Sequence, residues 1–409
     1  MSLIRLQPAQ ALACILEHTP LLGGVEVPLP SAEGRVLRQE IHAGRDFPAF
    51  DRVCMDGIAI QWQKAAHTWL HQACQVAGDR PLLLENFEHA IEVATGAVKP
   101  RGADTIVRYE DVQRRGREWI LKPDIEIKRG QHIQPRGSEH RSGQSLLEPL
   151  QLLRAPEHGL LAALGRGRVL VSAEPRISLI SNGSELVGID AEIEPHQMRE
   201  CNSFAARACL SAFHFQRVRA LHARDCADDL REAIQSALGC SDLLILSGGI
   251  SRGPKDLVAG VLTALGVEEI FSEIAQKPGR PFWFGKHPDG PLVLGLPGNP
   301  VAALLNLRLY ALPALCKMEG RVLRPLRLRL QHAEKAFPDA ARHLACRIAY
   351  DEEEQRWADV SLPLGVGGGS GNIGALAGTD GFISLPARER DYAAGELVLF
   401  HGWTPPSQG

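Results

Sequence analysis

The chain has 409 residues, a formal net charge of −3, 44% hydrophobic residues and 23% charged residues. This length leaves room for two to four globular domains, and the charge gives no general attraction to nucleic acid or to an anionic membrane surface. No stretch approaches eighteen uninterrupted apolar residues, and the first twenty residues form an amphipathic pattern. We therefore expect no nucleic-acid partner, no membrane span and no signal peptide.

Cysteine usage indicates a reducing compartment. The nine cysteines are an odd number and include no CxxC pair, which argues against a disulfide framework and against a zinc site. Most of them lie in helix-like or strand-like context, where a small buried thiol is the ordinary interpretation. We expect a cytoplasmic protein.

The first part of the chain is predicted to change from helix to β structure and back. Residues 1–45 have a largely helical pattern. In residues 46–144, short apolar runs such as AIEVATGA and DTIVRYEDV alternate with Gly, Pro and charge, which indicates a β-rich domain. Residues 145–172 return to helix. We expect that helix to pack with the N-terminal one, so that 1–45 and 145–172 form one discontinuous domain.

The second part is predicted to contain an α/β domain followed by a β domain. In residues 173–325, the strand patterns PRISLIS, SDLLILS and PLVLG each lead into a loop, and helical patterns recur between them. Strands and helices that alternate at this length predict a mostly parallel sheet. Residues 326–409 alternate in the manner of strands and predict a small β-sandwich or barrel.

Three turns that follow these strands are rich in Gly, Asn, Ser or Pro, at the sheet edge where open α/β domains bind ligands. In SGGISRGPKD, the small residues Gly248, Gly249 and Gly253 let backbone N–H groups approach an anion. A single turn of this kind is better explained by tight local geometry. Three turns on one edge, with charged residues beside them, favour a phosphate-bearing ligand.

Two further features of this region suggest an anion site. In QKPGRPFWFG, Lys277 and Arg280 flank Pro278-Gly279, so a rigid turn directs both cations to one place; a solvated basic turn is the alternative. In GLPGNP, Pro297 and Pro300 stiffen the loop before anything binds, which lowers the ordering cost of binding.

Six motifs together resemble a known family. PAFDRVCMDGIAI, ATGAVKPRGADTIVRYED, PRISLISNGSELV, LSGGISRGPKD, KPGRPFWFG and GLPGNP occur in the order and approximate spacing of the molybdopterin molybdenumtransferases, which include bacterial MoeA and the E-domain of gephyrin. The resemblance spans essentially the whole chain. It implies an elongated multidomain α/β plus β protein: a discontinuous linker and dimerisation domain (1–45 and 145–172), a β-rich domain (46–144), a doubly wound α/β molybdopterin-binding domain (173–325) and a C-terminal β-barrel-like domain (326–409).

The resemblance also implies a reaction. Members of this family insert molybdate into adenylylated molybdopterin and release AMP, with Mg²⁺ assisting, in molybdenum cofactor biosynthesis. It further implies a homodimer, and we expect contacts with a molybdopterin adenylyltransferase and with molybdoenzyme maturation proteins. Positioning and electrostatics should carry this chemistry, since it needs no nucleophilic side chain. The oxyanions of molybdenum and tungsten have the same charge and similar shape, so the choice between them stays open.

The family's site residues carry over motif by motif. The resemblance implies catalytic roles for Asp56, Thr95, Glu185, Asp256, Lys277 and Arg280. It implies substrate binding by Gly248, Gly249, Ser251, Gly253, Pro297, Gly298, Asn299, Pro300 and Ser370. Glu185 and Asp256 are the expected metal ligands, because hard cations such as Mg²⁺ prefer carboxylate oxygens.

Four positions depart from the family pattern. Ser184 and His140 stand where acidic residues are usual, Arg280 stands where lysine is common, and Ile58 replaces a usual tyrosine. Two missing carboxylates would weaken a cation site and change the field that molybdate meets. A non-catalytic paralogue that binds pterin cofactor or a partner protein is therefore the alternative to the transferase.

Overall fold

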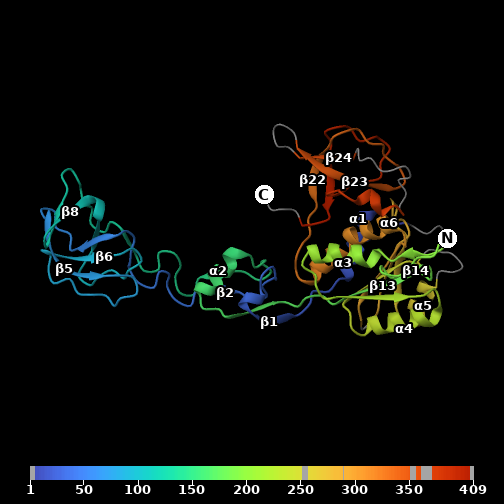
Figure 1. The fold of residues 1–409 in the computed structure, drawn as a ribbon, viewed down its shortest axis with the longest axis horizontal. Helices are drawn as coiled ribbons and strands as arrows, with labels where there is room; N and C mark the ends of the chain where they lie inside the picture. The colour runs from blue at the N-terminus through green and yellow to red at the C-terminus, as the bar shows by residue number, and fades with distance from the viewer. Residues whose placement is uncertain (1–4, 251–256, 289, 351–355, 361–370, 406–409) are drawn as a thin grey trace. The chain divides into compact units, whose positions relative to one another are not determined.

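The computed structural model describes residues 5–250, 257–288, 290–350, 356–360 and 371–405. The chain divides into two compact units, and each is described here by itself (Figure 1). Unit 1 comprises residues 1–26, 34–36 and 170–409, and unit 2 comprises residues 27–33 and 37–169. The chain passes between the units within strands β1 (Gly24–Pro28) and β12 (Arg168–Ser172), and again on either side of residues 34–36.

Unit 2 is β-rich, as the short apolar runs predict. Its main sheet has six strands in the order β7-β4-β6-β5-β9-β8. They are β4 (Gly57–Ile60), β5 (Thr68–Gln75), β6 (His89–Val93), β7 (Thr105–Arg108), β8 (Val112–Arg115) and β9 (Glu118–Leu121). The short strands β3 (Arg52–Val53) and β10 (Ile133–Gln134) pair with each other, as do β2 (Ile41–His42) and β11 (Ser145–Leu147). Helix α2 (Ala155–Ala163) and the 3₁₀ turns η1 (Leu29–Ser31) and η2 (Tyr109–Asp111) complete the unit.

Unit 1 contains the predicted doubly wound α/β domain. Its six-stranded sheet has the order β16-β13-β17-β21-β20-β18. Four strands are parallel: β13 (Ile177–Asn182), β16 (Val218–Ala223), β17 (Leu243–Ser247) and β21 (Leu292–Leu296). The antiparallel strands β20 (Trp283–Lys286) and β18 (Glu268–Ser272) extend one edge. A small two-stranded sheet follows β13 and consists of β14 (Leu186–Val187) and β15 (Met198–Arg199).

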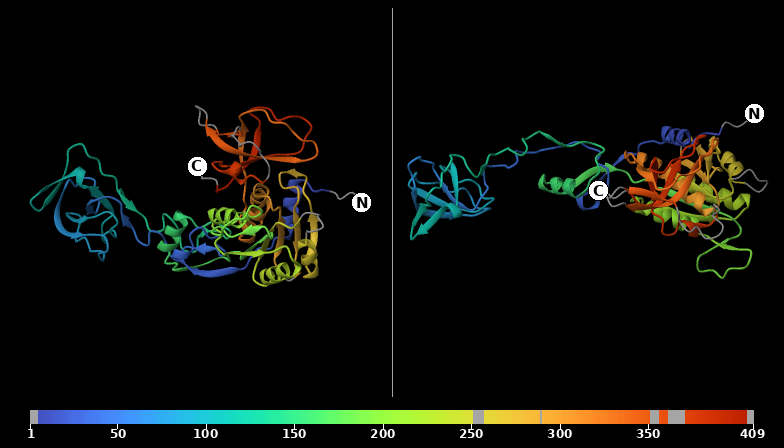
Figure 2. Two further views of the ribbon diagram at one scale, coloured as in Figure 1. Left: turned by 45° about the vertical axis from the view of Figure 1, so that its right-hand side comes forward. Right: turned by 90° about the horizontal axis from the view of Figure 1, so that it is seen from above.

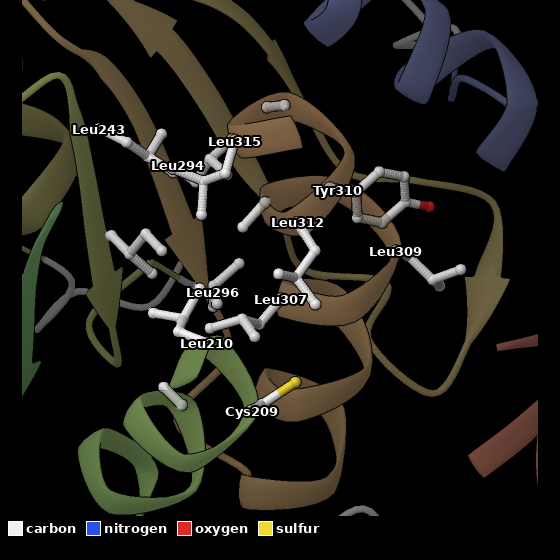
Figure 3. Close-up of a cluster of buried hydrophobic side chains, with 14 of the residues drawn as sticks. Cys209, Leu210, Leu243, Leu294, Leu296, Leu307, Leu309, Tyr310, Leu312 and Leu315 are labelled. Carbon is white, nitrogen blue, oxygen red and sulfur yellow. The ribbon is translucent and has the colours of Figure 1, made fainter. Parts of the chain in front are cut away.

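Helices cover both faces of this sheet, because its strands are apolar on both sides. Helices α3 (Asn202–Ala212), α6 (Pro300–Asn306) and α7 (Leu312–Met318) pack on one face, where Leu294 and Leu296 point toward Leu307 and Leu312 (Figure 3). Helices α4 (Ala227–Leu238) and α5 (Val258–Ala264) pack on the other, against strand residues such as Val293. The central parallel strands β13, β17 and β21 are thereby buried, whereas the edge strand β16 is partly exposed.

Helix α6 continues through the π-helical turn η3 (Leu307–Ala311) into α7, forming one helix from Pro300 to Met318. Among the described residues this is the one helix long and apolar enough to cross a bilayer, and 83% of its apolar window is buried inside the protein. The core helix of a globular domain has the same properties, so the helix is weak evidence of a membrane span.

The C-terminal strands form the predicted barrel-like domain within unit 1 (Figure 2). Strands β22 (Leu326–Leu330), β23 (Ala341–Tyr350), β24 (Arg356–Asp359), β25 (Gly381–Leu385) and β26 (Leu397–Gly402) make a closed ring, because β23 pairs with both β24 and β25. Strand β19 (Gln276–Lys277) of the α/β domain joins this sheet by pairing with β23, and the 3₁₀ turn η4 (Ile373–Leu376) lies between β24 and β25 in sequence. The last sheet and the α/β domain are thus joined by backbone hydrogen bonds.

The expectation of a largely helical N-terminus is wrong in extent. Helix α1 spans only Pro8–His18, and strands and turns follow it. Gly23-Gly24 and the prolines at 20, 28 and 30 end the helical pattern, because Gly and Pro destabilise helix interiors. Helix α1 packs on η3 and α7 in unit 1, whereas α2 belongs to unit 2. The four-part domain division with its stated bounds stays a prediction.

Candidate active site

The predicted turns meet at one cleft in unit 1. The cleft lies where β13, β17 and β21 end. The carboxyl ends of neighbouring parallel strands share one sheet edge, which is why residues far apart in sequence line it together. Of the predicted residues, the cleft is lined by Glu185, Gly249, Pro297, Gly298, Asn299 and Pro300.

The turn after β17 requires glycine. Gly248 and Gly249 have φ of +95° and +66°, in the left-handed region that favours glycine. A Cβ on Gly248 would lie 2.4 Å from the Asn182 backbone oxygen, and one on Gly249 would lie 2.5 Å from Asn182 Nδ2. The two neighbouring turns therefore approach each other too closely for a side chain. Ser251, Gly253 and Asp256 from the same motif lie outside the described residues.

The loop that carries Pro297 and Pro300 is fixed by the helix that follows it and by a hydrogen bond from the start of α3. Asn299 is the N-cap residue of α6 and Pro300 is the first helical residue, a position that tolerates proline well. Asn202, at the start of α3, donates from Nδ2 to the Gly298 oxygen at 2.8 Å and to Ser247 Oγ at 2.7 Å. One amide thus joins the loop to the end of β17. Ser370, predicted to bind substrate here, lies outside the described residues.

Ser184 is paired with a carboxylate that the motif analysis did not single out. Asp225 accepts from Asn182 Nδ2 at 2.7 Å and from the Ser184 backbone N–H at 2.9 Å, and its own N–H donates to Ser184 Oγ at 3.0 Å. Where the family has an acidic residue at 184, this chain therefore still has a carboxylate beside it. Asp225 follows parallel strand β16, so the strand-end rule could have identified it from the sequence.

Glu185 differs from Asp225 in having no side-chain partner among the described residues. Its side chain is exposed and lines the cleft, and its carboxylate makes no hydrogen bond or ion pair within the described part of the chain. The described residues contain no group of three or more His, Cys, Asp and Glu able to hold a metal ion. In the described part of the chain, Glu185 and Glu200 line the cleft and Asp225 lies beside Ser184, and carboxylates of this kind suit a hard cation. The second predicted ligand, Asp256, lies outside the described residues.

Lys277 and Arg280 lie together in a second cleft, which adjoins the first at Pro281. Arg5 and Arg342 also line it. Sequence reasoning missed both, because they come from distant segments: Arg342 pairs with Lys277 across the β19–β23 register, and Arg5 precedes α1.

The charges in this basic cleft are only partly offset. Arg280 and Arg5 contact Glu273 at 3.2 and 3.0 Å, and although burial favours its neutral form, these guanidinium groups lower the pKa of Glu273. Lys277 Nζ lies 5.8 Å from the centre of the Phe337 ring. Within the described residues Lys277 has no hydrogen bond or ion pair, so its charge is available to an anion.

Asp56 and Thr95 come together in unit 2. The Thr95 backbone N–H donates to Asp56 Oδ1 at 2.6 Å, and this bond lowers the pKa of the exposed Asp56 carboxyl. Of the two departures in this unit, Ile58 is fully buried in β4 and packs in the apolar core. His140 is half-buried, and its Nδ1 is buried without a hydrogen-bond partner.

Comparisons with known proteins agree along the whole chain. Three family models match: the MoeA N-terminal region (domains I and II) over residues 6–165, a probable molybdopterin binding domain over 178–317, and the MoeA C-terminal region (domain IV) over 332–403. A molybdopterin molybdenumtransferase from Synechocystis is 32% identical over 97% of this chain and 99% of its own length. The chain belongs to the molybdopterin molybdenumtransferase family. The family resemblance drawn from the motifs is therefore confirmed.

Other members of the molybdopterin molybdenumtransferase family are also similar to this chain over most of its length. The protein from Nostoc is 29% identical over 91% of this chain and 87% of its own length. The crystal structure of a molybdopterin biosynthesis MoeA protein from Pyrococcus horikoshii, 27% identical, has a TM-score of 0.79 and covers 98% of this chain and 99% of that one. The multidomain fold predicted from the sequence is confirmed by this structural match.

Proposed function

We propose that this protein is an active molybdopterin molybdenumtransferase, which inserts molybdate into adenylylated molybdopterin and releases AMP in molybdenum cofactor biosynthesis. One observation carries the proposal. A basic cleft that contains Lys277, which has no ion pair among the described residues, adjoins a cleft built from Gly and Pro turns at the edge of a parallel sheet. A substrate with phosphate groups and an oxyanion co-substrate need two adjoining sites of this kind.

The two clefts would bind different substrates. The backbone of Gly248 and Gly249 and the loop around Gly298 would hold the phosphate-bearing parts of the pterin substrate, since small residues let N–H groups approach an anion. Lys277, Arg280 and the two arginines beside them would offset the charge of molybdate. Attraction between opposite charges strengthens where water is excluded, so these cations also stabilise charge that develops during AMP release.

Glu185 and Asp225 would hold Mg²⁺, with Asp256 as the further ligand that the family resemblance implies. A divalent cation would supply charge neutralisation at the phosphoanhydride. The assignment is supported by the carboxylate of Glu185, which has no partner in the part of the chain that the structure describes. The serine at 184 removes one candidate ligand but leaves Asp225 beside it. Asp56 and Thr95 are proposed as catalytic residues on the family resemblance alone.

The proposal extends to assembly and location. We infer a cytoplasmic homodimer that exchanges substrate with a molybdopterin adenylyltransferase and passes product to molybdoenzyme maturation proteins. Support comes from the family resemblance, since dimerisation and these partners accompany the reaction in the family. Light scattering of the purified chain would give its mass against the 44.5 kDa of one copy.

Single-turnover AMP release from adenylylated molybdopterin, with molybdate and Mg²⁺, tests the enzyme. We expect molybdate-dependent release by the wild type and its loss in Asp256→Ala. The His140→Asp variant measures what the histidine contributes. Tight substrate binding without release in the wild type, together with release gained in His140→Asp, would instead identify a binding paralogue that lost catalysis at that position.

A further inference from the structure

A buried polar network lies directly beneath the turn that carries Lys277 and Arg280. Gln276, Asn306, Tyr310 and His343 are each at most 4% exposed, although all of them carry polar atoms. Burying such groups costs free energy unless they are hydrogen-bonded, so apolar side chains would fill the same space more cheaply. A network of four therefore calls for an explanation beyond filling the core.

The bonds of this network converge on the turn. Gln276 donates from Nε2 to Asn306 Oδ1 at 2.6 Å and to the Gly279 backbone oxygen at 3.1 Å. Asn306 donates from Nδ2 to the same Gly279 oxygen at 3.2 Å. Gln276 immediately precedes Lys277, and Gly279 immediately precedes Arg280. The network thus holds the chain next to both cations.

The turn packs directly against these two amide side chains. Gly279 has φ of +88°, and a Cβ there would lie 2.7 Å from Asn306 Oδ1 and 2.9 Å from Gln276 Nε2. The turn can therefore take its position only with a glycine at 279 and with both amides oriented as they are. This is direct packing of backbone on buried side chains.

Two separate parts of unit 1 hold Gln276 itself. Tyr310, on the core helix, donates its hydroxyl proton to Gln276 Oε1 at 2.5 Å, and Figure 3 shows that hydroxyl pointing away from the leucine cluster. His343, on β23 of the C-terminal domain, places Nε2 3.4 Å from the same oxygen and Nδ1 2.9 Å from Ser384 Oγ. Since Gln276 Oε1 only accepts, the histidine donates from Nε2 and accepts at Nδ1.

We infer that Gln276, Asn306, Tyr310 and His343 are positioning residues, which set the places of Lys277 and Arg280 in the basic cleft before the oxyanion binds. The inference rests on the proposed function, because that function assigns the cleft to molybdate. A turn fixed in advance pays less conformational entropy on binding, and both cations keep one geometry. Gln276 and His343 lie in the wall of the cleft but are at most 4% exposed, so we assign all four side chains an action through the turn.

Asn306→Leu tests this inference, because leucine fills a similar volume and makes none of the bonds. Tyr310→Phe removes one hydroxyl and serves as the milder variant if Asn306→Leu fails to fold. The matched control is Ser178→Ala. Ser178 is 1% exposed, accepts from Ser241 Oγ at 2.6 Å and lies near the start of β13, at the opposite edge of the sheet.

Two measurements separate positioning from mere stability. Calorimetric titration with molybdate alone should show a dissociation constant about tenfold higher in Asn306→Leu, a smaller rise in Tyr310→Phe and less than about a twofold change in Ser178→Ala. Hydrogen exchange of the backbone in residues 277–281 should quicken in the two network variants and stay unchanged in the control.

The outcomes also separate this inference from the proposed function. Unchanged exchange at 277–281 and unchanged molybdate affinity in variants whose Tm has fallen would overturn the inference and leave the proposed function intact. A wild type that binds no molybdate would contradict the proposed use of the cleft. In that case faster exchange in Asn306→Leu, set against Ser178→Ala, would still establish that the network positions the turn.

Discussion

The candidate residues of the two units are held in contrasting ways. In the α/β unit, Lys277 and Arg280 sit on a turn supported by buried amides, and the glycine turn after β17 packs directly on Asn182. In the β-rich unit, Asp56 is exposed and its carboxylate is held by Thr95. Changes in the first unit should therefore disturb geometry and stability together. Changes at Asp56 should act on chemistry alone.

The largest expected effect comes from removing the Lys277 cation. Lys277→Ala should lower kcat/KM for AMP release by about 10²- to 10³-fold, the scale seen when one charge-stabilising group is deleted from an active site. Lys286→Ala removes the same charge at the opposite edge of the sheet, where β20 pairs with the start of β21, and should leave the rate within about twofold. Equal losses in both variants would show that only the overall charge matters.

A methyl group at Gly249 should produce the next largest effect. Gly249→Ala forces a left-handed residue to carry a Cβ that would lie 2.8 Å from Val258 Cγ2, so unfolding should become easier by about 2–3 kcal/mol. Gly260→Ala is the matched control, because its Cβ meets nothing within 4 Å and alanine favours a helix interior. We expect that control to gain up to about 1 kcal/mol. Urea unfolding of both variants gives the comparison.

Acid should weaken unit 1 through its buried histidines. Burial lowers the pKa of His343 to about 4 and, with help from Arg308, that of His401 to about 3. The unfolded chain binds protons near pH 6.5, so stability is present above that pH and is lost as the pH falls toward 4. Between pH 6.5 and pH 5, each histidine should lower the free energy of unfolding by about 2 kcal/mol.

Unfolding at a series of pH values checks this effect. In His343→Gln, the free energy of unfolding should fall less steeply with acid, by the contribution of one histidine. His196→Gln changes an exposed position and should leave this dependence on pH unchanged. A dependence that is equally steep in all three proteins would assign the acid sensitivity to other groups.

The smallest effect on stability is expected at Asp56. The Thr95 hydrogen bond lowers the pKa of this carboxyl, so its contribution is present above the ordinary aspartate pKa and is lost only as the pH falls below it. At pH 7, Asp56→Asn should shift Tm by no more than about 1–2 °C, since the site is exposed. The same variant should release AMP more slowly. A large fall in Tm would mean that Asp56 is structural and would remove the contrast between the units.

Local pattern was enough to predict much of the fold. The apolar runs at β13, β17 and β21 predicted a parallel sheet because strands buried on both faces have few polar residues, and the strand-end turns predicted one shared edge. The N-terminal helix was overestimated because an amphipathic pattern says little about where a helix ends. Asp225 was missed because it lies in no glycine-rich motif, although it follows a parallel strand like the others.

The sequence by itself determined the class of each domain, the family, and the short motifs whose glycines, prolines and cations lie within a few residues of one another. Only the tertiary structure decided which residues that are far apart in the sequence lie close together. It placed Arg5 and Arg342 beside Lys277, and it put Asn306 under Gly279. The physical reason is that periodicity and turn chemistry act over a few residues, whereas a cleft or a buried hydrogen bond depends on how separate elements pack.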